Sequence, residues 1–238
     1  MDLIPVRKDT TGYMYDKVSG RLFGNSGTGD FILGEDIIPI EYLKSTGTQW
    51  IQTDYYPDSS VTDMTLDIEF YGTWNNSSGS IVCAHDSDSP WLAYGFNFPG
   101  SGNNSTTQIF AWTGYMYRHG GSTKSISGIS KDRGEFKYSN GVFSYGGKTL
   151  NTEVVAGRRM NALRIFSSVG NETAVFKAFN ANLYGLYIKE NNELIRDYIP
   201  VRIGQVGYLY DKVSNRLFGN SGTSDFVLGP DKEGGILW

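Results

Sequence analysis

Apolar and polar residues alternate along many short stretches of this chain of 238 residues. The clearest case is the run 64–70, in which Met64, Leu66 and Ile68 alternate with polar neighbours. Successive side chains of a β-strand point to opposite faces, so a period of two predicts a strand with one buried face.

Similar short runs recur between clusters of Gly, Asn and Ser, which are turn residues. No segment has the 3.6-residue period of an amphipathic helix. Many short strands joined by such turns predict an all-β fold, an antiparallel sandwich of the jelly-roll type. Further strands are expected at residues 49–53, 80–84, 91–98, 107–113, 134–138, 142–145, 162–166, 173–176, 182–189 and 194–201.

An internal duplication is the strongest feature of the sequence. Residues 2–36 (copy 1) match residues 197–231 (copy 2) at a constant offset of 195, with 10 differences and 25 identities over 35 positions. The chain therefore divides into an N-terminal tail motif (1–36), a central jelly roll (37–198) and a C-terminal tail motif (199–238) that docks on the jelly roll.

Each copy has the pattern of a small β unit. In copy 2, strands are expected at residues 207–210, 216–218 and 225–229, separated by turns. Asn215 occupies the turn position that favours a positive φ, and Gly20 is its counterpart in copy 1.

A β unit of this size is marginal in water, so each copy must pack on something. The sequence leaves two explanations for copy 1: it belongs to a lost neighbour in a tandem array, or it docks on an equivalent surface of another subunit. Contacts of the second kind build rings or fibres. The side chains of copy 1 expected at an assembly contact are Tyr13, Tyr15, Leu22, Phe23 and Phe31.

Composition excludes several classes of protein. The formal net charge is −4 and no block of Lys or Arg stands out, so we expect no nucleic-acid partner, which would need a concentrated basic surface. No apolar run approaches the roughly 20 residues of a bilayer-spanning helix, so no membrane span is expected. The single cysteine, Cys83, cannot form an internal disulfide.

The first residues lack the basic and apolar regions of a signal peptide. The protein is therefore expected to stay where it is made or to leave by lysis, as virion proteins do, unless the chain has been trimmed.

Three stretches resemble a known family. Residues 40–53, with Tyr-Leu-Lys-Ser-Thr-Gly-Thr-Gln-Trp at their centre, are similar to the opening motif of LamG-like, concanavalin A-like domains of gut bacteria and their phages. Residues 183–202 resemble the closing hairpin of these domains, and the tail motif resembles their usual C-terminal extension. The resemblance covers nearly the whole chain, most weakly from about residue 72 to 160, and implies the fold more than the function.

The same jelly roll carries laminarinase-type glycoside hydrolases, which place acidic residues at every second position of one strand. The nearest match has Thr65 in place of the first carboxylate, followed by Asp67 and Glu69. Since the retaining mechanism would lack its nucleophile, we expect no enzyme. Cys83 and His85 would share a face of one strand, but a buried structural thiol is expected there rather than a catalytic pair.

No cofactor is expected, and the sequence has no zinc spacing. The loop that holds Asp86 and Asp88 offers oxygen ligands of the kind that calcium prefers. A plain solvated turn is the simpler interpretation, because a third carboxylate is missing.

Sugar rings stack on aromatic faces, and their hydroxyl groups need polar partners. In the run 91–98, Trp91 and Asn97 would share a face with the small residues Ala93 and Gly95, which leaves room for a ligand. The candidates for carbohydrate binding are Trp74, Trp91, Asn97, Trp112, Tyr117 and Arg118.

Three functions follow from these features. The first is a phage virion protein, such as a capsid decoration, head-fibre or tail-fibre component, whose tails bind other copies or other virion proteins. The second is a bacterial surface or secreted module that binds cell-surface glycans. The third is a degenerate glycoside hydrolase.

Overall fold

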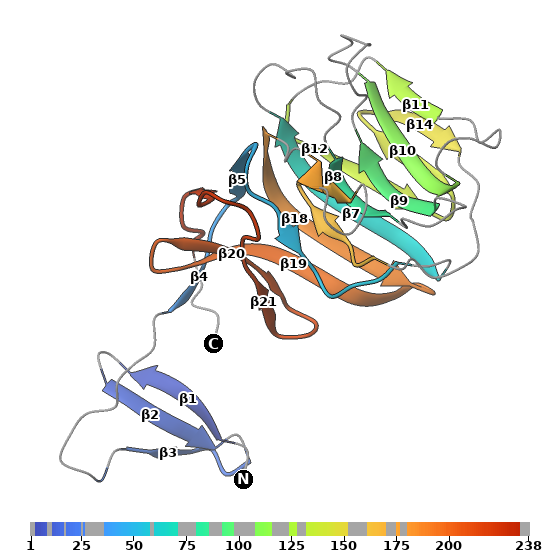
Figure 1. Ribbon diagram of the computed structural model, residues 1–238. Helices are drawn as coiled ribbons and strands as arrows, with labels where there is room; N and C mark the ends of the chain where they lie inside the picture. The colour runs from blue at the N-terminus through green and yellow to red at the C-terminus, as the bar shows by residue number, and fades with distance from the viewer. Residues whose placement is uncertain are drawn as a thin grey trace.

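The structure is a computed structural model of the whole chain. It describes residues 3–8, 11–16, 18–24, 26, 36–57, 60–70, 80–85, 92–97, 108–115, 124–127, 132–151, 161–169, 175–176 and 180–233. Within these residues every regular element is a β-strand, and every strand pair is antiparallel (Figure 1). The predicted all-β antiparallel fold is confirmed.

Two large sheets form the body. The larger sheet follows the order β14-β13-β12-β7-β18-β19-β20-β21, with β4, β5 and β22 paired off this path. Its strands are β4 (Ile37–Pro39), β5 (Leu43–Thr46), β7 (Val61–Phe70), β12 (Gly134–Ser139), β13 (Val142–Tyr145), β14 (Lys148–Asn151), β18 (Asn180–Glu190), β19 (Glu193–Ile203), β20 (Val206–Asp211), β21 (Arg216–Phe218) and β22 (Val227–Leu228).

The second large sheet follows the order β11-β10-β9-β8-β15-β6. Its strands are β6 (Ile51–Gln52), β8 (Ser80–His85), β9 (Leu92–Asn97), β10 (Gln108–Tyr115), β11 (Lys124–Ser127) and β15 (Arg164–Ile165). A small sheet pairs β16 (Ser168–Val169) with β17 (Val175–Phe176), and another contains β1 (Leu3–Lys8), β2 (Thr11–Asp16) and β3 (Arg21–Phe23).

The core lies between the two large sheets, which gives the body its sandwich form. On β7 the predicted alternation is confirmed, because Met64, Leu66 and Ile68 are fully buried. They belong to one apolar cluster with Val82 and Ile165 of the second sheet. Burial of this apolar surface is the main stabilising contribution to such a domain.

Copy 2 is built into the sandwich. The long strand β19 pairs with β18 through residues 186–190 of the latter and with β20 through residues 198–203 of its own. Its last residues also pair with β4, and β22 pairs with β5. The strands of copy 2 are therefore strands of the large sheet.

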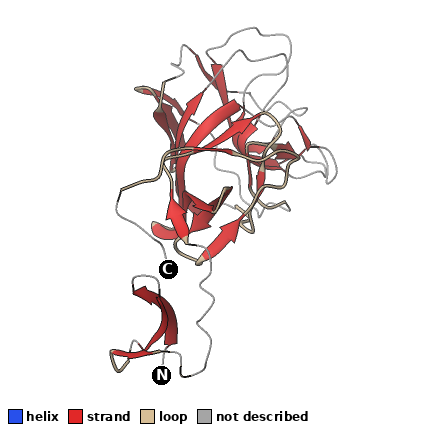
Figure 2. Cartoon of the chain, turned by 90° about the vertical axis from the view of Figure 1, so that its left-hand side faces the viewer, coloured by secondary structure: helices blue, strands red, loops and turns tan. Residues whose placement is uncertain are grey.

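Copy 1 forms a sheet of its own. Strands β1, β2 and β3 pair with one another, and Figures 1 and 2 show this sheet apart from the sandwich in both views. The two copies nevertheless share one conformation at the turn: Gly20 has a φ of 68° and Asn215 a φ of 56°. The prediction of a positive φ at this position is confirmed in both.

Substitution of a phenylalanine in each copy should separate their contributions to stability. Phe218 is 7% exposed and packs edge-on against Tyr198, with ring centroids 5.6 Å apart, whereas Phe23 is 41% exposed. We predict that Phe218→Ala lowers the free energy of unfolding by about 3–5 kcal/mol. The matched Phe23→Ala should change it by about 1 kcal/mol or less. Chemical denaturation measures both, and equal losses would contradict the difference in burial.

Candidate functional site

The second half of copy 2 follows a segment at the start of the sandwich, residues 39–54, which we call the acceptor segment. The Ser221 amide donates to the Trp50 carbonyl at 2.7 Å, and the Trp50 amide donates to Asn220 Oδ1 at 3.2 Å. Farther along, the Gly229 amide donates to the Tyr42 carbonyl at 2.9 Å. Backbone pairing therefore fixes copy 2 on the acceptor segment at both ends.

Gln49 connects the acceptor segment to copy 2 with a buried amide. Its Nε2 donates to the Asp225 carbonyl at 2.8 Å, while its Oε1 accepts from the Thr46 amide at 2.8 Å. Its side chain is 1% exposed. A buried amide with both ends hydrogen-bonded fixes the register of the two segments, since a shifted register would leave it unsatisfied.

Glycines of copy 2 allow its backbone to approach closely. A Cβ at Gly222 would overlap the Thr48 carbonyl oxygen, and one at Gly229 would lie 2.8 Å from the Tyr42 nitrogen. A Cβ at Gly207 would lie 2.5 Å from Cδ2 of Leu43. These positions require glycine because of the space that the docked backbone leaves, and not because of a special dihedral angle.

Apolar side chains of copy 2 complete the contact. Phe226 is 5% exposed and lies near Phe166, with ring centroids 5.9 Å apart. Phe226, Phe218 and Leu209 belong to the main apolar cluster of the sandwich. Copy 2 therefore contributes to the same hydrophobic core as the strands it covers.

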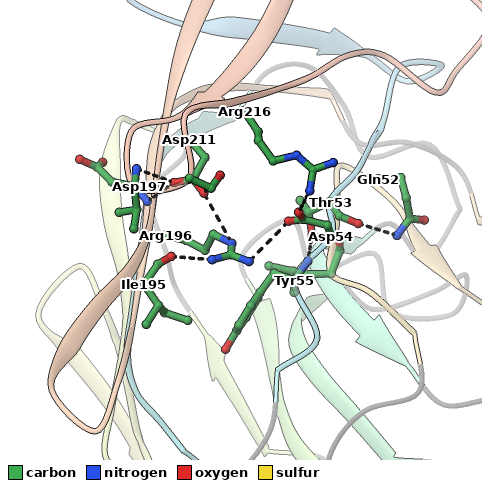
Figure 3. A network of polar contacts seen from close by, with 12 residues as sticks. Gln52, Thr53, Asp54, Tyr55, Ile195, Arg196, Asp197, Asp211 and Arg216 are labelled. Atoms are coloured by element: carbon green, nitrogen blue, oxygen red, sulfur yellow. Dashed lines mark hydrogen bonds and ion pairs between the residues drawn. The ribbon is translucent and has the colours of Figure 1, made fainter. Parts of the chain in front are cut away.

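A chain of alternating charges fastens the β20–β21 turn to the acceptor segment (Figure 3). Arg216 forms an ion pair with Asp54. Asp54 Oδ1 lies 3.6 Å from Nη2 of Arg196, whose Nε lies 3.5 Å from Oδ2 of Asp211. We call these four residues the charge latch; they come from β19, β20, β21 and the acceptor segment.

Asp211 is the most deeply buried member of the charge latch, at 0% exposure. Its Oδ1 accepts from the amides of Asp197 at 2.9 Å and Val213 at 3.1 Å, and its Oδ2 accepts from Ser214 Oγ at 2.6 Å. A buried carboxylate is tolerated when hydrogen bonds and a cation satisfy it, as they do here.

Tyr198 lies beside the charge latch and is fully buried. Burial raises the pKa of its phenol well above the ordinary value, and Arg196 acts in the opposite direction. Two atoms of the latch, Asp54 Oδ1 and Arg196 Nε, are buried without a hydrogen bond. The latch is therefore held by ion pairing and burial more than by complete hydrogen bonding.

Copy 1 reproduces the internal geometry of copy 2. Strands β1 and β2 pair from Leu3↔Asp16 to Lys8↔Thr11, and β19 and β20 pair from Tyr198↔Asp211 to Ile203↔Val206, 195 positions later. The turn is capped in the same way: Asp16 accepts from the Val18 amide at 3.2 Å and from Ser19 Oγ at 2.6 Å. The two copies are therefore one structural unit in two settings.

The residues of copy 1 that were expected at an assembly contact differ in how far the structure describes them and how exposed they are. Phe23 and Leu3 are 41% and 40% exposed, whereas their counterparts Phe218 and Tyr198 are 7% and 0% exposed. Tyr13 is half-buried, with its ring near Gly24 as the Tyr208 ring is near Gly219. The side chains of Tyr15, Leu22 and Phe31 lie outside the described part of the chain.

Most of the expected carbohydrate-binding residues lie outside the described residues: Trp74, Trp91, Tyr117 and Arg118. Asn97 and Trp112 belong to β9 and β10, where Phe110 pairs with Asn97 and Trp112 with Gly95. Asn97 and Trp112 therefore occupy adjacent rows on one face of the sheet, together with the small residue Gly95.

The carboxylates of β7 take part in contacts on the outer face of the larger sheet. Asp67 accepts from Nε and Nη2 of Arg133, at 3.0 and 2.6 Å, and Arg133 stacks on the Tyr184 ring at 3.7 Å. Glu69 accepts from the Tyr184 hydroxyl at 2.6 Å. Burial and this hydrogen bond raise the pKa of Tyr184. The sequence did not predict this cluster, because its members lie far apart in the chain.

The Cys83 thiol is buried, at 1% exposure, as expected. Asp86 and Asp88 lie outside the described residues. Within the described residues no three His, Cys, Asp or Glu side chains gather as a metal site. The part of the chain that the structure describes also contains no helix long and apolar enough to cross a membrane.

Comparison with known proteins found no match among protein-family models, curated proteins or solved structures. The resemblance to LamG-like domains therefore stays a prediction from sequence motifs.

The buried phenol of Tyr198 predicts a loss of stability in alkali. Its raised pKa stabilises the fold fully below the unfolded value, about 10, and this stabilisation is lost as pH rises through the folded value. We predict that Tyr198→Phe reduces the fall in unfolding free energy above about pH 10. Tyr56→Phe, at an exposed position, is the control. Identical pH profiles for the two variants would contradict the role of Tyr198.

Proposed function

We propose that the chain is a non-enzymatic structural module of a multiprotein assembly, most consistent with a phage virion protein such as a capsid decoration, head-fibre or tail-fibre component. In this proposal the sandwich is the body of the module, and copy 1 is the element that attaches it to a partner in the particle.

The observation that carries the proposal is the pair of copies. One β unit occurs twice with the same strand register, and it is buried against a sandwich in copy 2 but exposes Phe23 and Leu3 in copy 1. A three-stranded sheet this small has little core of its own. Copy 1 therefore has the properties of a docking element without its docking surface.

The identities between the copies support the same conclusion. Of the copy 2 residues that contact the acceptor segment or its core, those retained in copy 1 include Gly12, Arg21, Phe23, Asn25, Ser26, Gly27, Asp30, Phe31, Leu33 and Gly34. Several are needed for docking and not for the unit itself, since Gly222 and Gly229 are constrained by Thr48 and Tyr42.

The face where a related hydrolase would place its acids supports a non-catalytic body. Thr65, at the first position, is 5% exposed. Asp67 is engaged by Arg133, and Glu69 by the Tyr184 hydroxyl. A retaining glycosidase needs two carboxylates separated by a substrate-sized gap, one as nucleophile and one as acid. The contacts of Asp67 and Glu69 support the proposal that this face is not catalytic.

Incorporation into particles tests the proposal. We predict that the full-length chain, tagged at its C-terminus in the lysate that produces it, co-sediments with purified particles in a density gradient. Phe23→Asp should remain in the unassembled fraction, because a charge replaces the apolar side chain that docking would bury. The control is Val18→Asp, at a position of copy 1 that is 75% exposed and whose counterpart, Val213, stays 43% exposed after docking. A wild-type chain absent from particles would refute the proposal.

Glycan binding is a second candidate, favoured by the strand register that brings Asn97 and Trp112 together beside Gly95. An aromatic residue, a glycine and an amide residue in neighbouring register positions suit the apolar face and hydroxyl groups of a sugar. We predict that a glycan-array ligand of the chain, if present, loses about tenfold or more in affinity in Trp112→Ala. An array without ligands, or a ligand unaffected by Trp112→Ala, would dismiss this candidate.

A further inference from the structure

Each chain carries two docking units and one acceptor segment. Copy 2 fills the acceptor segment of its own sandwich through the backbone pairs, the glycine contacts and the charge latch described above. Association of intact chains through these elements therefore leaves one docking unit per chain without an acceptor. If copy 1 of one chain replaced copy 2 on the acceptor segment of another chain, the released copy 2 would lose the contacts that copy 1 gained.

Copy 1 cannot use the acceptor segment of its own chain. In copy 2, residues 229–231 pair antiparallel with residues 40–42. The counterparts of these residues are 34–36, which would have to turn back through residues 37–39 to reach the same place. Those three residues form β4, an extended strand paired with Val201, Arg202 and Ile203. Residues 37–39 cannot form this turn and strand β4 at the same time.

We propose that copy 1 docks on a second β-sandwich of this kind whose acceptor segment is not covered by a copy of its own. The inference rests on the proposed function, and it adds the identity of the partner surface. The partner has a surface with the chemistry of residues 39–54 of this chain. An intact second copy of this chain does not offer that surface, because its own copy 2 covers it.

The contacts of copy 2 define what the partner must present. Arg21 needs a carboxylate at the position of Asp54, and Asn25 needs a backbone amide that can donate at the position of Trp50. Phe23 needs an apolar pocket such as the one that receives Phe218. Gly27 and Gly34 need backbone carbonyl and amide groups close enough to exclude a Cβ.

Two buried positions differ between the copies and give the contact its selectivity. Leu3 stands at the position of Tyr198, and Met14 at that of Leu209. Leucine fills less volume than the buried tyrosine, so a partner with a larger side chain facing that position would bind copy 1 more tightly than the acceptor segment of this chain does. Methionine adapts readily to the shape of a core, so the second difference is tolerated.

The full-length chain can be converted into its own partner. Gly222→Ala/Gly229→Ala adds two Cβ atoms that collide with Thr48 and Tyr42, and this should displace residues 219–231 from the acceptor segment. The corresponding end of copy 1 in a neighbouring chain, with Gly27 and Gly34 intact, then takes their place. We predict that this double variant associates head to tail, raising the mass measured by light scattering at least about twofold, while the wild type is monomeric.

The duplication supplies the matched controls. Gly27→Ala/Gly34→Ala makes the same change in copy 1 and should leave a monomer of unchanged stability. The quadruple variant, with all four glycines replaced, should also be monomeric, because neither copy can dock. A folded, monomeric Gly222→Ala/Gly229→Ala chain would overturn the proposal, and so would a quadruple variant that associates to the same extent.

A second measurement covers the case in which Gly222→Ala/Gly229→Ala does not fold alone. It is refolded with excess wild-type chain or with excess Gly27→Ala/Gly34→Ala chain. A soluble complex that is recovered with excess wild-type chain but not with excess Gly27→Ala/Gly34→Ala chain supports the proposal. Equal recovery in the two mixtures, or recovery in neither, overturns it. If the Gly222→Ala/Gly229→Ala chain does not bind copy 1 while the Phe23→Asp chain is still absent from particles, attachment through copy 1 stands. The partner surface is then a different one.

Discussion

The structure depends on one constraint: a three-stranded β unit of about 35 residues has two faces and cannot bury either against itself. Copy 2 meets this constraint by making its strands part of the larger sheet and by placing Phe218 and Phe226 in the common core. Copy 1 has the same strands and the same turn but exposes Phe23. The difference between the copies lies in their surroundings, and the function proposed for the chain follows from that difference.

The charge latch is secondary to this burial. Arg216 is largely exposed, and exposed ion pairs contribute about 0–1 kcal/mol. The buried end is different: Asp211 accepts three hydrogen bonds and lies beside Arg196, so loss of either partner would leave a charge uncompensated inside the protein. The latch therefore defines how copy 2 is oriented on the sandwich, while apolar contacts supply most of the stability.

Local patterns in the sequence predicted the elements whose signal is local. The alternation around Met64 gave β7, residues 142–145 gave β13 without error, and the turn at Asn215 gave the correct sign of φ. The short strands β4 and β5 were missed because their pairing with β19, β18 and β22 depends on segments far away in the chain. The ion pair between Asp54 and Arg216 joins residues 162 positions apart. A contact between residues so far apart produces no local sequence pattern. The way copy 2 docks on the sandwich could therefore be recognised only in the three-dimensional structure.

The pairing of β4 with the end of β19 has a mechanical consequence. The chain that leads from copy 1 enters the sandwich at β4, antiparallel to residues 201–203. A pull on an anchored N-terminus would therefore act along the axis of β4. Its hydrogen bonds to β19 would be stretched together, in shear, rather than opened one after another. A module attached by its N-terminal end would thus transmit tension directly into the hairpin formed by β18 and β19.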